Sequence, residues 1–278
     1  MKKIFLILLF SIAFSLFSQE TIESKFSIPD GFEREIVSDY HKWLITHPLK
    51  KENVVINYKG ESYNRHGELY AAVFDYRMGA TKSHQCADAA IYLYARHKWD
   101  SIHKLNENIR NYEKLKFHSS HSTLMTYEDY LRGVKYGIND DYTDIKIDWT
   151  NLQPRADNIQ IFEKWLYYIF SWSSTYSIEG TGDSEPVELS DISPGDFFNQ
   201  NRHVISIVDV IRNKETGDKK YILSQSIWRT GVNTYGEEQY ILINPETGNI
   251  WYDLIPGKML VTPEWDYYPW EEAIRRFK

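Results

Sequence analysis

The chain contains 278 residues, carries a formal net charge of −7, and is 15% aromatic. This acidic balance argues against nucleic acid or an anionic lipid surface as the main partner. The sequence has a single cysteine, which excludes a disulfide-stapled domain and leaves either a core residue or a reactive thiol.

Residues 1–18 have the pattern of a secretory signal. Lys2 and Lys3 form its charged start, and residues 4–17 form its apolar segment. That segment is short for a membrane span, which needs about 20 residues. We therefore expect an exported protein, periplasmic or extracellular, without stable membrane insertion once the signal is cleaved.

Residues 19–278 are long enough for one domain, with a helical insertion at about residues 100–180. Apolar residues recur with a helical period in the first part of this domain and are interrupted by short β-branched runs. The expected elements are a helix over residues 32–44, strands over 54–58 and 69–76, a helix from Cys86 to about 99, helical segments over 103–117 and 127–136, and a helix over 157–176 capped by Asp157 or Asn158.

The last third of the chain predicts an antiparallel sheet. A tight turn at residues 193–196 leads into residues 197–198, and the next strand opens at His203. A hairpin loop over residues 212–219 then returns the chain through a partner strand, residues 221–226. A further strand is expected over residues 240–244, and a short helix ending at Phe277. Helices first and an antiparallel sheet last are typical of an α+β fold.

Cys86 is the first candidate for chemistry. Ala, Leu and Arg are good helix formers, and they follow Cys86 without Gly or Pro. Cys86 is therefore expected in the first turn of a helix, where backbone N–H groups and the helix dipole stabilise a thiolate. A pKa of about 3.5 to 7.5 is typical of such a thiol beside a cation.

A thiol nucleophile needs a base and a group that orients the base. His203 is the best candidate for the base, because a histidine at the start of a strand lies near the edge of a sheet. The hairpin brings Gln225 within a residue or two of His203 on the partner strand, so Gln225 is the candidate orienting group. Ser224 and Ser226 are the alternatives, because a one-residue slip in register exchanges the faces.

These residues resemble the NlpC-type papain-fold cysteine peptidases, which cut peptidoglycan stem peptides. Cysteine at a helix start, Pro194-Gly195-Asp196 before a strand, histidine opening that strand and a polar residue on its partner carry the resemblance. It implies a papain-like α+β fold, with Cys86 as nucleophile, His203 as base and Gln225 as orienting group. Gln-Cys-Ala-Asp stands here where those enzymes have Asp-Cys-Ser-Gly.

A second resemblance covers most of residues 19–278. Gln-Cys-Ala-Asp-Ala at residues 85–89, residues 194–209, Ser-Gln-Ser at residues 224–226 and Thr-Pro-Glu-Trp at residues 262–265 are similar to an uncharacterised family of exported bacterial proteins. That family is a domain of unknown function, so this resemblance implies a fold and no activity.

Three further residues are candidates for binding substrate. Gln85 precedes the cysteine and is a possible oxyanion donor, Asp75 ends a predicted strand before the cysteine, and Trp228 follows Gln225 as an aromatic residue suited to a cleft rim. Asp88 is expected to cap its own helix. No cofactor or metal is expected, because His118 and His121 have no carboxylate or cysteine nearby in the sequence to complete a set.

These patterns predict an exported protein with a cysteine nucleophile. The resemblance to NlpC-type peptidases implies a hydrolase or acyltransferase that acts on an amide bond, with a peptide or peptidoglycan-type substrate. The alternative is a non-catalytic envelope or glycan-binding protein that keeps a papain-like fold. A third reading makes Cys86 a core residue of a structural domain.

Overall fold

The computed structural model describes residues 19–57, 60–63, 66–76, 85–139, 141, 143–200, 202–226, 238–264, 266–267 and 270–278. The predicted signal at residues 1–18 lies outside these ranges. Within them, no helix has the length and apolar character needed to span a bilayer.

The described helices are short apart from two. They are α2 (Ile22–Lys25), α3 (Asp39–Thr46), α4 (Cys86–His103), α5 (Tyr127–Arg132), α6 (Ile159–Trp172) and α7 (Thr175–Gly180), with 3₁₀ turns at Glu107–Ile109, Leu189–Asp191 and Trp270–Ala273.

The described strands form one large sheet and four two-stranded pieces. They are β1 (Phe32–Glu33), β2 (Val55–Ile56), β3 (Ser62–Tyr63), β4 (Tyr70–Val73), β5 (Lys116–His118), β6 (Leu124–Thr126), β7 (Lys135–Ile138), β8 (Ile145–Asp148), β9 (Ser184–Pro186), β10 (Phe197–Gln200), β11 (His203–Asn213), β12 (Lys219–Gln225), β13 (Tyr240–Leu242), β14 (Trp251–Tyr252), β15 (Leu260–Val261), β16 (Asp266–Tyr267) and β17 (Ile274–Phe277).

The large sheet has the order β4-β13-β12-β11-β10-β17-β9, with β1 added to β11 and β14 added to β12. All of these pairings are antiparallel. The predicted antiparallel sheet is therefore present, and the protein is a mixed α/β structure with a few helices. β4, from the first part of the chain, joins the edge of this sheet through β13.

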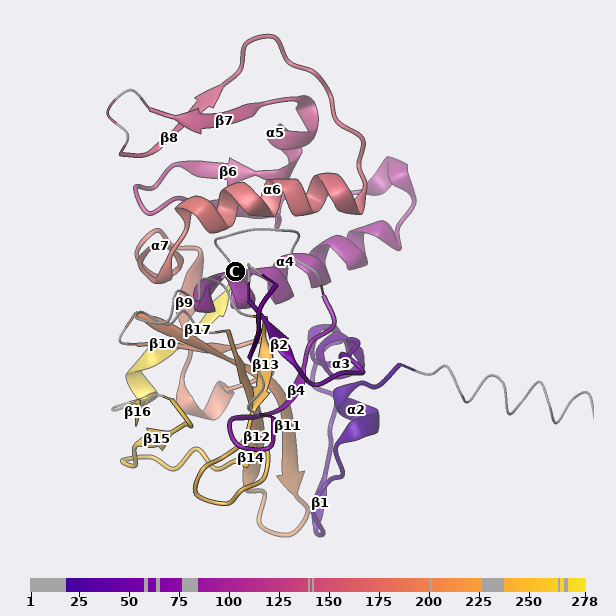
Figure 1. Ribbon diagram of the computed structural model, residues 1–278, viewed down its shortest axis with the longest axis vertical. Coiled ribbons are helices and arrows are strands. Elements are labelled where there is room, and N and C mark those ends of the chain that lie inside the picture. The colour runs from indigo at the N-terminus through magenta and orange to yellow at the C-terminus, as the bar shows by residue number, and fades with distance from the viewer. Residues whose placement is uncertain are drawn as a thin grey trace, which may run out of the picture.

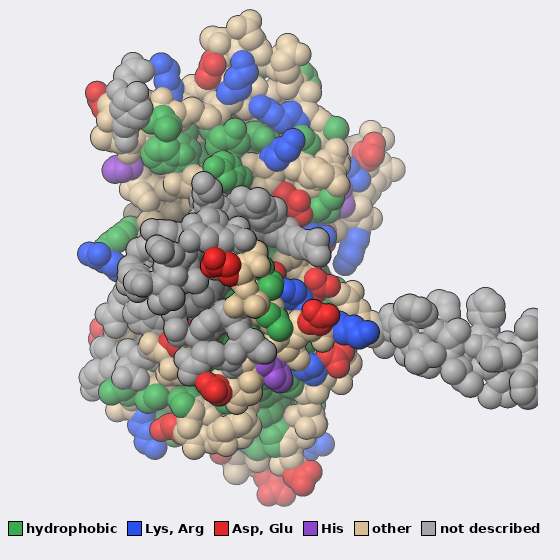
Figure 2. Space-filling view, viewed as in Figure 1, with side chains coloured by type: hydrophobic (Ala, Val, Ile, Leu, Met, Phe, Trp, Pro, Cys, Tyr) green, Lys and Arg blue, Asp and Glu red, His purple; other side chains and the backbone are tan. Residues whose placement is uncertain are grey.

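Helix α4 lies between two lobes (Figure 1). Below it is the sheet lobe. Above it is the insertion lobe, which we define as residues 104–180. The insertion lobe holds α5–α7 and also two hairpins, β5–β6 and β7–β8, so this region is less helical than the sequence suggests. On the face drawn in Figure 2, hydrophobic side chains gather over the insertion lobe.

The sheet carries apolar side chains on both faces. Val204 and Val208 of β11 belong to the same buried cluster as α4, whereas Ile205 and Ile207 belong to a second cluster. Since successive side chains of a strand point to opposite faces, α4 covers one face of the sheet and the second cluster lies on the other.

Three helix starts follow capping rules. Asn158 accepts a hydrogen bond from the Ile161 N–H at 3.0 Å, so of the two predicted caps of α6, Asp157 and Asn158, the structure has Asn158. Asp88 accepts from the Gln85 N–H at 2.6 Å, so it caps α4 as expected. Ser38 caps α3 and shortens the helix predicted over residues 32–44 to its second half.

The extended segment before Ser38 has a tertiary cause. Arg34 donates to the buried Asp209 of β11 at 2.7 and 2.9 Å, and His41 Nε2 lies 2.8 Å from the same carboxylate. An ion pair at this depth is stable only when the charges are compensated and hydrogen-bonded. The contacts of Arg34 and His41 with Asp209 therefore outweigh the helical preference of this segment.

The Pro194-Gly195-Asp196 turn packs against Tyr40 and pairs with strand β17. Gly195 has φ +100°, and a Cβ there would lie 2.5 Å from the ring of Tyr40. Asp196 is buried and pairs with Arg276 of β17 at 2.6 Å. Ile274–Phe277 form strand β17, which pairs with β10 on one side and β9 on the other. The helix predicted to end at Phe277 is therefore wrong.

Candidate functional site

The N-terminus of α4 opens into a cleft of about 590 Å³, which we call the Cys86 cleft. Cys86 and His203 both border it, so the structure brings the two predicted residues to one place. Its other wall comes from the insertion lobe, at the end of α6 and the start of α7. That wall carries hydroxyl and aromatic side chains, among them Ser171, Trp172 and Tyr176.

The thiol of Cys86 is held by backbone groups. It is 8% exposed, and its Sγ atom donates to the carbonyl oxygen of Arg202 at 3.9 Å. The backbone N–H of Val204 acts to lower the pKa of the thiol. The backbone carbonyl of Arg202, the residue before His203, thus holds the thiol.

Burial raises the pKa of the Cys86 thiol to about 11. The backbone N–H groups of Val204, Ala87 and Cys86 act in the opposite direction, as expected at a helix start, but they are outweighed. The predicted lowering of this pKa is therefore wrong, because the cost of desolvating the thiolate exceeds the stabilisation from the helix terminus.

His203 is tied to the next strand. Its Nε2 atom lies 2.9 Å from Gln225 Oε1, and both side chains are buried. Burial lowers the pKa of His203 to about 4, while the Gln225 bond acts to raise it. The imidazole is therefore neutral at pH 7.

The orientation of Gln225 determines the tautomer of His203. The Gln225 amide nitrogen donates to Tyr240 Oη at 3.1 Å and to Glu264 Oε2 at 3.2 Å. Tyr240 in turn donates to the same carboxylate oxygen at 2.8 Å. The amide oxygen must then face the imidazole, so His203 Nε2 carries the proton and Nδ1 carries the lone pair.

Cys86 and His203 approach the end of β11 from different sides. Alternation along β11 places His203 with Ile205, on the face away from α4, while Cys86 packs with Val204 on the α4 face. The sulfur therefore lies beside the start of β11, where it contacts the backbone carbonyl of Arg202. Arg202 itself has a left-handed φ of +63° at this corner.

Of the three candidates for the third group, Gln225 contacts the His203 imidazole through its amide oxygen. Ser224 lies on the opposite face, where its Oγ accepts from Gln239 at 2.8 Å. Ser226 is fully buried. The register that pairs Ser206 with Ser224 leaves Gln225 diagonal to His203.

The three predicted substrate-binding residues have different outcomes. Gln85 is exposed and borders the Cys86 cleft. Asp75 lines a second cleft and accepts a hydrogen bond from Gln19, so the structure gives no support to its predicted place beside Cys86. Trp228 lies outside the described residues.

A family model described as a domain of unknown function (4846) matches residues 22–275. The chain belongs to this family. No curated protein and no solved structure matches it significantly. Membership in the family covers both lobes, including the insertion lobe and the hydrogen-bonded chain from His203 to Glu264.

Two members of that chain, Tyr240 and Glu264, were missed as functional candidates. The Thr-Pro-Glu-Trp segment was visible in the sequence as a motif, but nothing local showed that Glu264 would contact Gln225. Tyr240 of β13 pairs with Gln225 of β12. The sequence between the two strands does not define their register, so this pairing could not be predicted.

Within the described ranges, no group of three or more His, Cys, Asp or Glu side chains is arranged to hold a metal ion. His118 instead pairs with Asp183 at 2.6 Å, and His121 borders the Cys86 cleft.

Proposed function

We propose that the protein is an exported cysteine hydrolase or acyltransferase that acts on an amide bond, with a peptide of peptidoglycan type as substrate. Cys86 is the nucleophile, His203 the base and Gln225 the orienting group. The observation that carries this proposal is the bond from His203 Nε2 to an amide oxygen whose own orientation is set by Glu264. It assigns the basic lone pair to Nδ1 of a histidine that borders the same cleft as the only cysteine.

The arrangement also supports a papain-like architecture. The cysteine begins a helix that packs on an antiparallel sheet, the histidine begins a strand, and the amide lies on the neighbouring strand. This is the order of parts that the resemblance to NlpC-type peptidases implies.

The resting pair is neutral, because burial keeps the proton on the thiol and off the imidazole. We therefore assign His203 the role of general base rather than partner in a resting ion pair. The Cys86 side chain turns from the Arg202 carbonyl towards the imidazole, and Nδ1 takes its proton as the sulfur attacks the substrate carbonyl carbon.

The next steps follow from the same groups. Backbone N–H groups at the start of α4 stabilise the oxyanion. The C–N bond breaks, the imidazolium returns its proton to the leaving amine, and a thioester remains on Cys86. Water or an acceptor amine then attacks the thioester, with His203 again taking the proton, and the thiol is restored.

An activated ester tests this proposal without knowledge of the substrate. Residues 19–278 are incubated with p-nitrophenyl acetate, and intact mass and peptide mapping locate any acetyl group. We expect acetyl-Cys86 and continuing nitrophenolate release, both lost in Cys86→Ala and reduced at least tenfold in His203→Ala. His121→Ala is the matched control, since His121 borders the same cleft.

Two results would contradict the proposal. One is acetylation of Cys86 at equal rates in the native protein and His203→Ala, which is the behaviour of an isolated thiol. The other is a Cys86 that acylates only in denaturant. The first result would remove His203 as the base, and the second would remove Cys86 as the nucleophile.

One observation favours the second candidate, a non-catalytic envelope protein that binds glycan or peptide. The thiol donates to Arg202 and not to the imidazole, and its pKa is raised. In that case the hydroxyl and aromatic wall of the Cys86 cleft forms the binding surface. A soluble muropeptide would then bind with equal affinity to the native protein and Cys86→Ala without being cleaved.

A further inference from the structure

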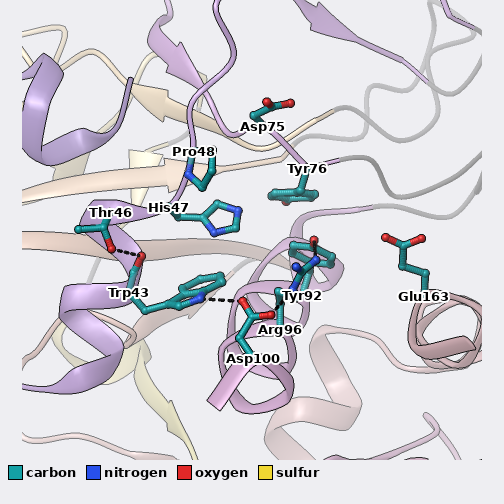
Figure 3. A pocket seen from close by; sticks show the side chains of 10 residues that line it. All are labelled: Trp43, Thr46, His47, Pro48, Asp75, Tyr76, Tyr92, Arg96, Asp100 and Glu163. Atoms are coloured by element: carbon teal, nitrogen blue, oxygen red, sulfur yellow. Dashed lines mark hydrogen bonds and ion pairs between the residues drawn. The ribbon is translucent and has the colours of Figure 1, made fainter. Parts of the chain in front are cut away.

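A second cleft, of about 380 Å³, lies between α3, the segment after β4, the middle of α4 and α6 (Figure 3). We call it the aromatic cleft. The residues that matter for the argument are Trp43, His47, Asp75, Tyr76, Tyr92 and Glu163. Clefts of this size hold small molecules or a single side chain of a partner.

Aromatic rings form much of its wall. Tyr76 and Tyr92 are stacked with ring centroids 3.9 Å apart, and Trp43 and His47 lie 4.3 Å apart. In Figure 3 these rings border the space into which His47 points. Aromatic faces attract cations as well as apolar groups.

The charged groups in the cleft do not balance. Arg96 pairs with Asp100 at 2.8 Å, and Trp43 donates to the same carboxylate at 2.9 Å, so this pair is internally compensated. Two carboxylates are left, on Asp75 and Glu163. Asp75 accepts a bond only from the uncharged Gln19 among the described residues.

Glu163 is the more informative of the two. It is partly buried on α6, and within the described part of the chain it has no hydrogen bond and no ion pair. Burial raises its pKa, although the charge of Arg96 acts in the opposite direction. A half-buried carboxylate without a partner is stabilised by a cation that enters the cleft.

His47 gives an independent sign of a ligand. The residue is 8% exposed, and its Nε2 atom is buried without a hydrogen-bond partner among the described residues. Burial lowers the pKa of His47 to about 4, so the ring is neutral at pH 7 and can accept a hydrogen bond. An unpaired buried polar atom costs free energy that a ligand donor would recover.

We propose that the aromatic cleft binds an organic cation, an alkylammonium group such as an amine or a lysine side chain. The carboxylates of Glu163 and Asp75 supply the opposite charge, the aromatic rings contact the alkyl stem, and His47 Nε2 accepts an N–H of the ammonium. An anion is disfavoured by the two carboxylates, and a neutral alcohol would leave Glu163 without a countercharge.

The test is calorimetric titration of residues 19–278 with pentylamine, and with pentanol and pentanoate as neutral and anionic analogues. We expect pentylamine to bind at least tenfold more tightly than either analogue, and its affinity to fall as salt is added. Glu163→Gln keeps the shape of the side chain and is expected to weaken pentylamine at least tenfold. Glu113→Gln, an exposed carboxylate elsewhere in the insertion lobe, is the matched control.

Thermal unfolding of each variant first confirms that it folds. Equal affinity for the three probes, no binding of pentylamine at millimolar concentration, or unchanged affinity in Glu163→Gln would each overturn the proposal. Cys86→Ala should bind pentylamine as the native protein does, so this site is tested independently of the proposed catalysis.

Discussion

The two clefts lie along the same helix and treat their buried polar groups differently. At the start of α4, the Cys86 thiol and the His203–Gln225–Glu264 chain have protein partners. Further along α4, the aromatic cleft leaves Glu163 and a buried His47 nitrogen without partners in the described chain. The polar groups of the first cleft are therefore held by hydrogen bonds within the protein. Those of the second cleft are available to a ligand.

The comparison is clearest for the two histidines. Burial lowers the pKa of both His203 and His47 to about 4. Only His203 has a side-chain acceptor that sets its tautomer, which is what a base of defined direction requires. The same pKa therefore accompanies two different arrangements. The His203 ring is oriented by a hydrogen bond, whereas Nε2 of His47 has no hydrogen-bond partner in the described chain.

The largest expected effect separates the clefts completely. Cys86→Ala should abolish thioester formation with p-nitrophenyl acetate, because no other thiol exists in the chain. It should leave pentylamine affinity within about twofold, since sites without shared partners are nearly additive. Intact mass and calorimetry on one preparation measure both quantities. A loss of pentylamine binding would show that the clefts are coupled.

The second prediction concerns pH. His203 and His47 have a pKa of about 4 in the folded protein, against about 6.5 when unfolded, so only the unfolded chain gains these protons as the pH falls below about 6.5. Stability from each neutral ring is complete above pH 6.5 and declines towards pH 4. Each histidine should contribute a loss of about 2 kcal/mol between pH 7 and pH 5.

Urea unfolding at pH 7 and pH 5 measures this loss in the native protein, His203→Gln and His47→Gln. Each variant should reduce the difference between the two pH values. His97, whose pKa is also lowered to about 4, contributes a remaining part. An identical pH dependence in all three proteins would show that these rings do not titrate as their burial implies.

The third prediction tests the organised chain. Gln225→Leu removes the acceptor of His203 and the donor to Glu264, and leaving buried polar groups unpaired costs about 1–3 kcal/mol. Acylation of Cys86 should slow by about 10–100-fold, the usual contribution of a positioned base being of this order or larger. Ser224→Ala, on the other face of the same strand, should leave the acylation rate unchanged. Equal rates in the two variants would remove Gln225 from the site.

The smallest effect is expected at Asp75. Asp75 is exposed, so Asp75→Asn should change the free energy of unfolding by less than about 0.5 kcal/mol. It should weaken pentylamine only a few-fold, less than Glu163→Gln does, because an exposed charge is screened by solvent. Calorimetry on the two variants gives the ranking. A larger loss at Asp75 than at Glu163 would place the cation at the mouth of the cleft.

Local patterns predicted the parts of the site that depend on neighbours in sequence. The helix start at Cys86, the strand start at His203 and the hairpin that brings Gln225 beside it all follow from periodicity, capping and turn residues. Asn158 was a correct cap for the same reason. Each of these features is determined by residues that lie close together in the sequence.

Tertiary contacts decided what sequence patterns missed. Arg34 holds an extended segment against Asp209 where periodicity favoured a helix. Ile274 and Phe277 form a strand because β10 and β9 lie on either side of it. The raised pKa of Cys86 depends on burial, and the bond from Gln225 to Glu264 joins segments 39 residues apart, so neither was visible locally.

The held thiol has a consequence for oxidation chemistry. Peroxides and disulfides react with thiolates, and exposed cysteines of low pKa are the ones they convert to sulfenic acid or mixed disulfides. Cys86 is 8% exposed and has its pKa raised to about 11, so its resting form is poorly reactive toward such oxidants. A lone cysteine of this kind is therefore slow to react with an oxidant, because its reactive thiolate is rarely formed.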